Sequence, residues 1–149
     1  MDSSHFWQSF QWLFMMGLEI VHLPAFGTAG VLLTVGLGIS LFRQKPFGSG
    51  RWKGYYWLVL TQFVFYPAVI AVGVRYQVAH SSLEPLSTVN PVADRMLNVL
   101  FYLSLALGVF WIYRLKGFRW FALCFVALLE LFLMGGLLVA GMSITGDWI

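Results

Sequence analysis

Charged residues are scarce in this sequence. Asp, Glu, Lys and Arg make up 10% of its 149 residues, while 60% are hydrophobic and the mean hydropathy is +0.80. A typical soluble domain has about 25% charged residues. A water-soluble core of this size cannot bury so much apolar surface. The composition therefore excludes an ordinary soluble domain and indicates an integral membrane protein.

Cysteine and enzyme motifs are also nearly absent. The one cysteine, Cys124, lies within an apolar stretch. It excludes an intramolecular disulfide, a CxxC pair and a cysteine-rich metal site, and we interpret it as a small buried residue. No GxSxG, Ser-x-x-Lys, HExxH or Gly-rich phosphate loop is found. We therefore expect no catalytic activity of its own and no metal site.

The first 42 residues contain neither Lys nor Arg. A secretory signal peptide begins with a positively charged region, so we expect no cleavable signal here. The basic residues are concentrated in two short segments, 43–53 and 114–119, between apolar stretches. Such placement is typical of membrane topology and argues against nucleic acid as a partner.

The long apolar stretches predict an all-α fold, an antiparallel bundle of four transmembrane helices in one domain over residues 1–149. An apolar helix needs about 20 residues to cross a bilayer. The expected spans are about 8–42, 55–77, 94–113 and 120–142. We expect a kink in the second span at Pro67.

The first stretch is too long for one perpendicular crossing and contains Pro24. Either an amphipathic segment from Phe6 to about His22 lies at the membrane interface and Pro24 starts the crossing, or one long tilted helix is kinked at Pro24. We favour the kinked helix. Small residues in this stretch are expected to let a neighbouring helix approach closely. They are Ala25, Gly27, Ala29, Gly30, Thr34, Gly36 and Gly38.

The charges predict an orientation. The two basic segments hold seven of the nine Lys and Arg residues and no acids: Arg43, Lys45, Arg51, Lys53, Arg114, Lys116 and Arg119. By the positive-inside rule both segments are cytoplasmic. Both termini and the polar segment 78–91 are therefore predicted on the non-cytoplasmic side. The predicted location is a bacterial inner, or plasma, membrane.

Glu130 stands out within the fourth span. An ionisable group in the hydrocarbon region costs at least about 2.5 kcal/mol on insertion scales, so it needs a partner or a role. Glu130 is a candidate proton-relay or ion-binding group, and the alternative, which we favour, is a hydrogen-bonded glutamate that joins two helices. The polar residues expected at similar depth are Thr34, Gln62, Tyr66 and Ser104.

Glu19 is a second candidate proton or ion group. Glu19 and His22 are three residues apart and so share a helix face. The Glu-x-x-His spacing occurs in di-metal helix bundles, but two copies are needed there and this chain has one. We therefore favour a local hydrogen bond between Glu19 and His22, or a pair between Glu19 and Arg75, over a metal site.

Two histidines and two arginines form the candidate cofactor site. His22, His80, Arg75 and Arg95 all fall on the predicted non-cytoplasmic half. Axial histidines, with arginines to meet the propionates, are what a b-type haem requires, and a quinone site could use the same residues. No two histidines are expected on facing helices at matched depth. We therefore favour interfacial histidines without a ligand.

Three functions follow from these features. The leading hypothesis is a small accessory or structural subunit of a larger membrane complex, a bioenergetic one being the example considered. Its partners would be the lipid bilayer and other membrane subunits or pigments. The first alternative is a subunit for electron transfer that binds haem b or quinone. The second is a transporter or pore, coupled to protons or ions, that uses Glu130.

Overall fold

The structure, a computed structural model, describes residues 3–19, 23–44, 52–77, 90–115 and 117–146. All regular structure in these ranges is helical. Four helical segments are long and apolar enough to cross a membrane: Pro24–Arg43, Tyr56–Arg75, Pro91–Arg114 and Arg119–Thr145. The predicted all-α fold with four membrane spans is therefore confirmed.

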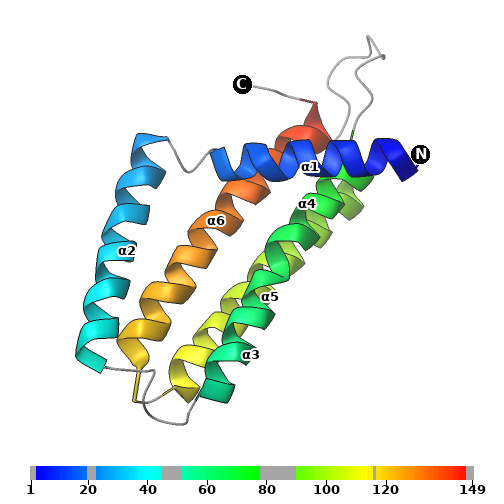
Figure 1. Cartoon of the computed structure of the whole chain (residues 1–149). Coiled ribbons are helices and arrows are strands. Elements are labelled where there is room, and N and C mark those ends of the chain that lie inside the picture. Colours follow the sequence, from blue (N-terminus) through cyan, green and yellow to red (C-terminus); the bar gives the residue numbers. More distant parts are fainter. Residues whose placement is uncertain (1–2, 20–22, 45–51, 78–89, 116, 147–149) are drawn as a thin grey trace.

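Successive spans run in opposite directions (Figure 1). In that view α2 (Pro24–Gln44) runs downward, and α3 (Trp52–Phe63) with α4 (Phe65–Arg75) returns upward as one interrupted span. Then α5 (Pro91–Arg114) runs downward and α6 (Arg119–Thr145) upward. The bundle is thus antiparallel.

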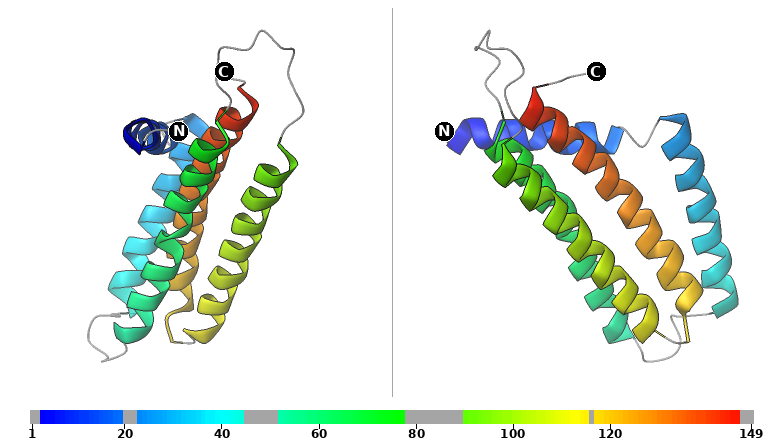
Figure 2. Two further views of the ribbon diagram at one scale, coloured as in Figure 1. Left: turned by 90° about the vertical axis from the view of Figure 1, so that its right-hand side faces the viewer. Right: turned by 180° about the vertical axis from the view of Figure 1, so that it is seen from behind.

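The first helix, α1 (Ser3–Glu19), does not follow this direction. It lies across α4 and α6 near one end of the bundle, and the side view of Figure 2 shows it end-on. The favoured single helix kinked at Pro24 is therefore corrected to two separate helices. Proline at the first helical position loses no hydrogen bond, because that N–H has no partner within the helix anyway. The first turn of α2 closes where the Gly27 N–H donates to the Leu23 carbonyl at 2.8 Å.

The second span is interrupted one turn before its proline. Pro67 has no N–H, and its ring clashes with the carbonyl four residues earlier, which belongs to Phe63. Accordingly α3 ends at Phe63 and α4 begins at Phe65. The expected disturbance by Pro67 is thus a one-residue break at Val64, and the Phe63 carbonyl lacks the helical donor that residue 67 would normally supply.

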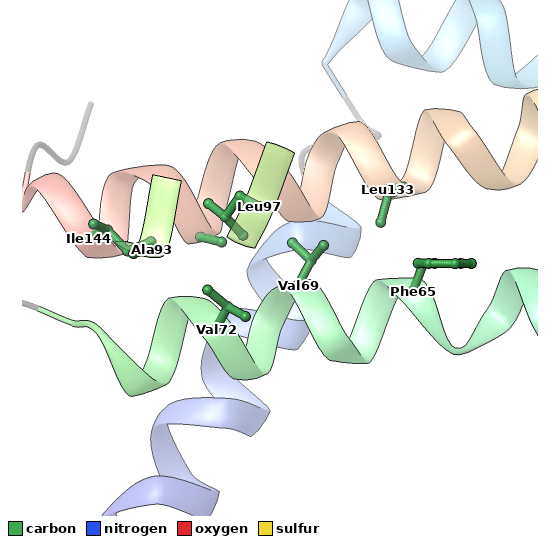
Figure 3. Close-up of a cluster of buried hydrophobic side chains, with 8 residues drawn as sticks. Phe65, Val69, Val72, Ala93, Leu97, Leu133 and Ile144 are labelled. Carbon is green, nitrogen blue, oxygen red and sulfur yellow. The ribbon is translucent and has the colours of Figure 1, made fainter. Parts of the chain in front are cut away.

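The main apolar core lies between α4, α5 and α6 (Figure 3). Its buried members are Phe65, Val69, Val72, Ala93, Leu97, Leu133, Ala140 and Ile144. Helices α4 and α6 approach closely at Gly73, where an added Cβ would lie 2.9 Å from Ala140 Cα. Ser143 Oγ donates to the Gly73 carbonyl at 3.3 Å, which joins the same two helices.

Helix α2 stands apart from this core. It packs chiefly on α6, on the side away from α4 and α5 (Figures 1 and 2), and only 6% of the residues in its apolar span are buried. An added Cβ at Gly36 would lie 3.1 Å from Cys124 Sγ, while Gly38 has nothing within 4 Å. The expected small-residue face is therefore used for close packing at Gly36 but not at Gly38.

Candidate functional site

Three polar side chains from three helices meet inside the bundle. Gln62 of α3, Ser104 of α5 and Glu130 of α6 are 4%, 1% and 7% exposed. The interior of a helix bundle in lipid contains no water, so buried polar side chains at the same depth form hydrogen bonds with each other. The prediction that Gln62 and Ser104 reach the depth of Glu130 is confirmed by the hydrogen bonds between them. We call these three residues the polar cluster.

Ser104 is the centre of the polar cluster. Its Oγ lies 2.5 Å from Glu130 Oε1 and 3.0 Å from Gln62 Oε1, and Gln62 Nε2 donates to the Ser104 carbonyl at 3.1 Å. A hydroxyl has one hydrogen and can donate to only one of the two oxygens at a time. When it donates to Gln62, the contact with Glu130 needs a proton on the carboxyl group. With a neutral glutamic acid, all of these short contacts are hydrogen bonds at once.

The second carboxyl oxygen of Glu130 has no hydrogen-bond partner among the described residues. Glu130 Oε2 is buried and makes no hydrogen bond with any described residue. A buried polar atom left without a partner costs about 1–3 kcal/mol. The polar cluster therefore joins three helices and leaves one buried carboxyl oxygen without a hydrogen bond to the described residues.

A pocket of about 250 Å³ adjoins the polar cluster beneath α1; we call it the α1 pocket. Its lining comes from α1, α3, α4, α5 and α6: Phe14, Leu18, Gln62, Phe63, Tyr66, Ser104, Leu129, Phe132 and Leu133. Tyr66 Oη donates to the Phe14 carbonyl at 2.8 Å, and this bond holds α1 over the pocket. Gly17 makes the close approach possible, because an added Cβ there would overlap the Tyr66 hydroxyl.

Glu130 also lines a mostly apolar groove of about 350 Å³ between α5 and α6. The other lining residues are all apolar: Leu105, Val109, Ile112, Leu123, Val126, Ala127, Leu131 and Met134. Ser104 lines the α1 pocket and Glu130 lines this groove. The hydrogen bond between Ser104 and Glu130 therefore connects the α1 pocket with the groove.

Only two of the four predicted cofactor residues, Arg75 and Arg95, lie within the described residues. Arg75 at the end of α4 and Arg95 near the start of α5 are both exposed. His22 and His80 lie outside the described residues. The haem or quinone site built from these four residues stays a prediction.

Glu19 lies apart from the polar cluster. It is exposed at the end of α1, whereas Glu130 is buried inside the bundle. Its expected partner His22 lies outside the described residues. Within the described ranges, no three His, Cys, Asp or Glu side chains gather closely enough to hold a metal ion.

The other two residues expected at the depth of Glu130 bond elsewhere. Thr34 Oγ1 donates to its own helix at the Gly30 carbonyl, at 2.7 Å, and Tyr66 bonds α1. The α1 pocket was not predicted, although Pro67, five residues after the polar Gln62, indicated an irregular helix at that depth. The hydrogen bond from Trp111 Nε1 to Thr61 Oγ1, 3.0 Å long, was not predicted either.

Comparison with protein families, with curated proteins and with solved structures finds no match. The function is therefore inferred from the fold and the geometry of the site.

Proposed function

We propose that this protein is an accessory subunit of a larger membrane complex and that α2 packs on a transmembrane helix of a partner subunit. The exposure of α2 supports the proposal. Its residues Val31, Leu32 and Val35 are 63%, 72% and 54% exposed, and Phe42 is 85% exposed. A partner helix would cover this face.

Helix α2 packs chiefly on one neighbour, α6, which favours a protein partner over lipid alone. Lipid tails are as apolar as leucine, so helices in a membrane are held by close packing and hydrogen bonds. The hydroxyls of Thr28, Thr34 and Ser40 donate to carbonyls of α2 itself. They are therefore not used to join α2 to α6, and a second neighbour would fix α2 in place.

We further propose the orientation in which the Arg114 end of the bundle is cytoplasmic. The exposed residues Arg43, Arg114 and Arg119 all lie at that end, which supports this assignment under the positive-inside rule. Helix α1 would then lie at the outer interface of a bacterial plasma membrane. Its exposed residues Trp7 and Trp12 suit the headgroup region.

Photo-crosslinking in native membranes tests the subunit proposal. Benzoyl-phenylalanine at Leu32 should give a protein adduct of one defined mass. The matched control is the same residue at Val99, which is 62% exposed on α5. The proposal fails if Leu32 yields lipid adducts only and the protein purifies in mild detergent as a lone 16.9 kDa chain.

A second candidate function is a proton or ion pathway through Glu130. The buried Oε2, which bonds none of the residues that the structure describes, favours it, because intramembrane carboxyl groups commonly serve proton and ion movement. Glu130→Gln keeps the shape of the side chain and a partner for Ser104 but removes the titratable group. Proton flux into pyranine-loaded liposomes should fall to the background of empty liposomes, while Glu19→Gln, at an exposed site, should keep the wild-type rate. Equal flux in wild type and Glu130→Gln would remove this candidate.

A further inference from the structure

We propose that the α1 pocket binds the headgroup of a prenylated quinone, an uncharged ring with oxygen substituents, whose isoprenoid tail extends into the lipid. This site differs from the predicted set of histidines and arginines. It also goes beyond the subunit proposal and does not depend on it.

The size and walls of the pocket suit one substituted ring. Its volume of about 250 Å³ lies below the range of about 300–1,000 Å³ for pockets that hold drug-sized ligands. Four of the lining side chains are aromatic: Phe14, Phe63, Tyr66 and Phe132. Aromatic rings favour edge and offset-stacked contacts with another flat ring.

Three of the lining residues, Gln62, Phe63 and Tyr66, carry hydrogen-bonding groups that an acyl chain could not use. An amide has two N–H donors, and Gln62 gives one to the Ser104 carbonyl, so the second can meet a ligand oxygen. Tyr66 Oη donates to α1 but can still accept. The Phe63 carbonyl lacks its helical donor because residue 67 is proline. A quinone carbonyl suits the donor, and a quinol hydroxyl suits the acceptors.

The electrostatics of the pocket favour an uncharged ligand. No Asp, Glu, Lys, Arg or His is among its lining residues. A charged ligand at this depth would lose its hydration without gaining a counter-charge. Haem propionates, phosphates and quaternary amines are therefore disfavoured, whereas a neutral quinone ring enters from the lipid without that cost.

Photoaffinity labelling of the full chain tests the proposal. The purified protein is placed in nanodiscs of synthetic phosphatidylcholine that contain no quinone and is labelled with an azido-ubiquinone. We expect saturable labelling of residues that line the α1 pocket, which decylubiquinone abolishes and n-decane leaves unchanged. If n-decane competes as well as decylubiquinone, the occupant is an acyl chain and the proposal is wrong.

Variants locate the site. Leu18→Trp fills the pocket from the α1 side without altering the polar cluster, and Gln62→Leu removes the amide. Each should weaken labelling about tenfold or more, which is the effect of losing about 1.4 kcal/mol of binding free energy. Leu32→Trp, on the outward face of α2, is the matched control for Leu18→Trp, and Glu130→Gln tests a polar-cluster change outside the pocket lining. Both should label as wild type.

Labelling of Leu18→Trp at the wild-type level overturns the site. Absence of saturable labelling in wild type does the same. Because Leu18→Trp leaves every hydrogen bond of the polar cluster in place, the test stands even when Gln62→Leu does not fold. Circular dichroism of each variant checks the helical content.

Discussion

At the scale of residues, one serine hydroxyl connects three helices. Ser104 of α5 bonds Gln62 of α3 and Glu130 of α6, so its loss affects both. Depth along the spans identified these partners, because a polar side chain in hydrocarbon must meet another. Depth alone did not distinguish Gln62 and Ser104 from Tyr66 and Thr34, because a nearly continuous apolar sequence does not show which face of each helix points into the bundle.

Ser104→Ala should lower the free energy of unfolding by about 1–3 kcal/mol, because it leaves the buried Glu130 carboxyl without its partner. Adding Glu130→Leu to this variant should restore part of the loss, since the unpartnered carboxyl is then gone. Unfolding by SDS in bicelles, followed by circular dichroism, measures both. A double variant less stable than Ser104→Ala would contradict this account.

Gly73 is required by space rather than by backbone conformation. Gly73→Ala should lower the free energy of unfolding by about 1–3 kcal/mol, because the new Cβ would lie 2.9 Å from Ala140 Cα. Gly141→Ala is the matched control, since nothing lies within 4 Å of a Cβ there. The control should equal wild type or gain up to about 1 kcal/mol from higher helix propensity. Equal stability of the two variants would show that α4 moves away at little cost.

At the scale of elements, prolines divide the chain. Pro24 begins α2 and Pro67 interrupts the second span, and both positions were expected to disturb a helix. The choice between a kink and a new helix at Pro24 could not be made from the sequence, because proline suits both. It depends on a contact between distant residues, the packing of Gly17 against Tyr66 and Gly136.

Tyr66→Phe should loosen α1 alone. The variant removes the hydrogen bond to the Phe14 carbonyl, which contributes about 0.5–1.5 kcal/mol, so backbone amides of α1 should exchange with deuterium about 2–13 times faster. Exchange in α5 and α6 should not change. Tyr102→Phe, which is 67% exposed on α5, is the control and should leave α1 at the wild-type rate. Unchanged exchange in Tyr66→Phe would mean that packing alone holds α1.

At the scale of the whole molecule, four spans in alternating direction follow from composition and loop charges. The alternation could be predicted because short basic turns connect antiparallel neighbours. The outlying position of α2 could not, because its apolar pattern differs little from that of α6. The burial of a helix depends on how many neighbouring helices it has, and the apolar pattern of α2 does not show how many that is.

Cysteine labelling checks the orientation. In a Cys124→Ser background, Ser4→Cys on α1 should react with a membrane-impermeant maleimide in intact spheroplasts, and Arg114→Cys should react only after the membrane is opened. Both parent residues are exposed, so access to the protein surface does not limit either. Reversed labelling would contradict the assignment of the Arg114 end to the cytoplasm.

The position of α1 on α4 and α6 also determines an order of assembly. Helix α1 precedes α4 and α6 in the chain, yet Gly17 lies against Tyr66 of α4 and Gly136 of α6, which are synthesised later. Helix α1 can therefore reach its native contacts only after α6 has been synthesised, so an early segment of the chain docks late.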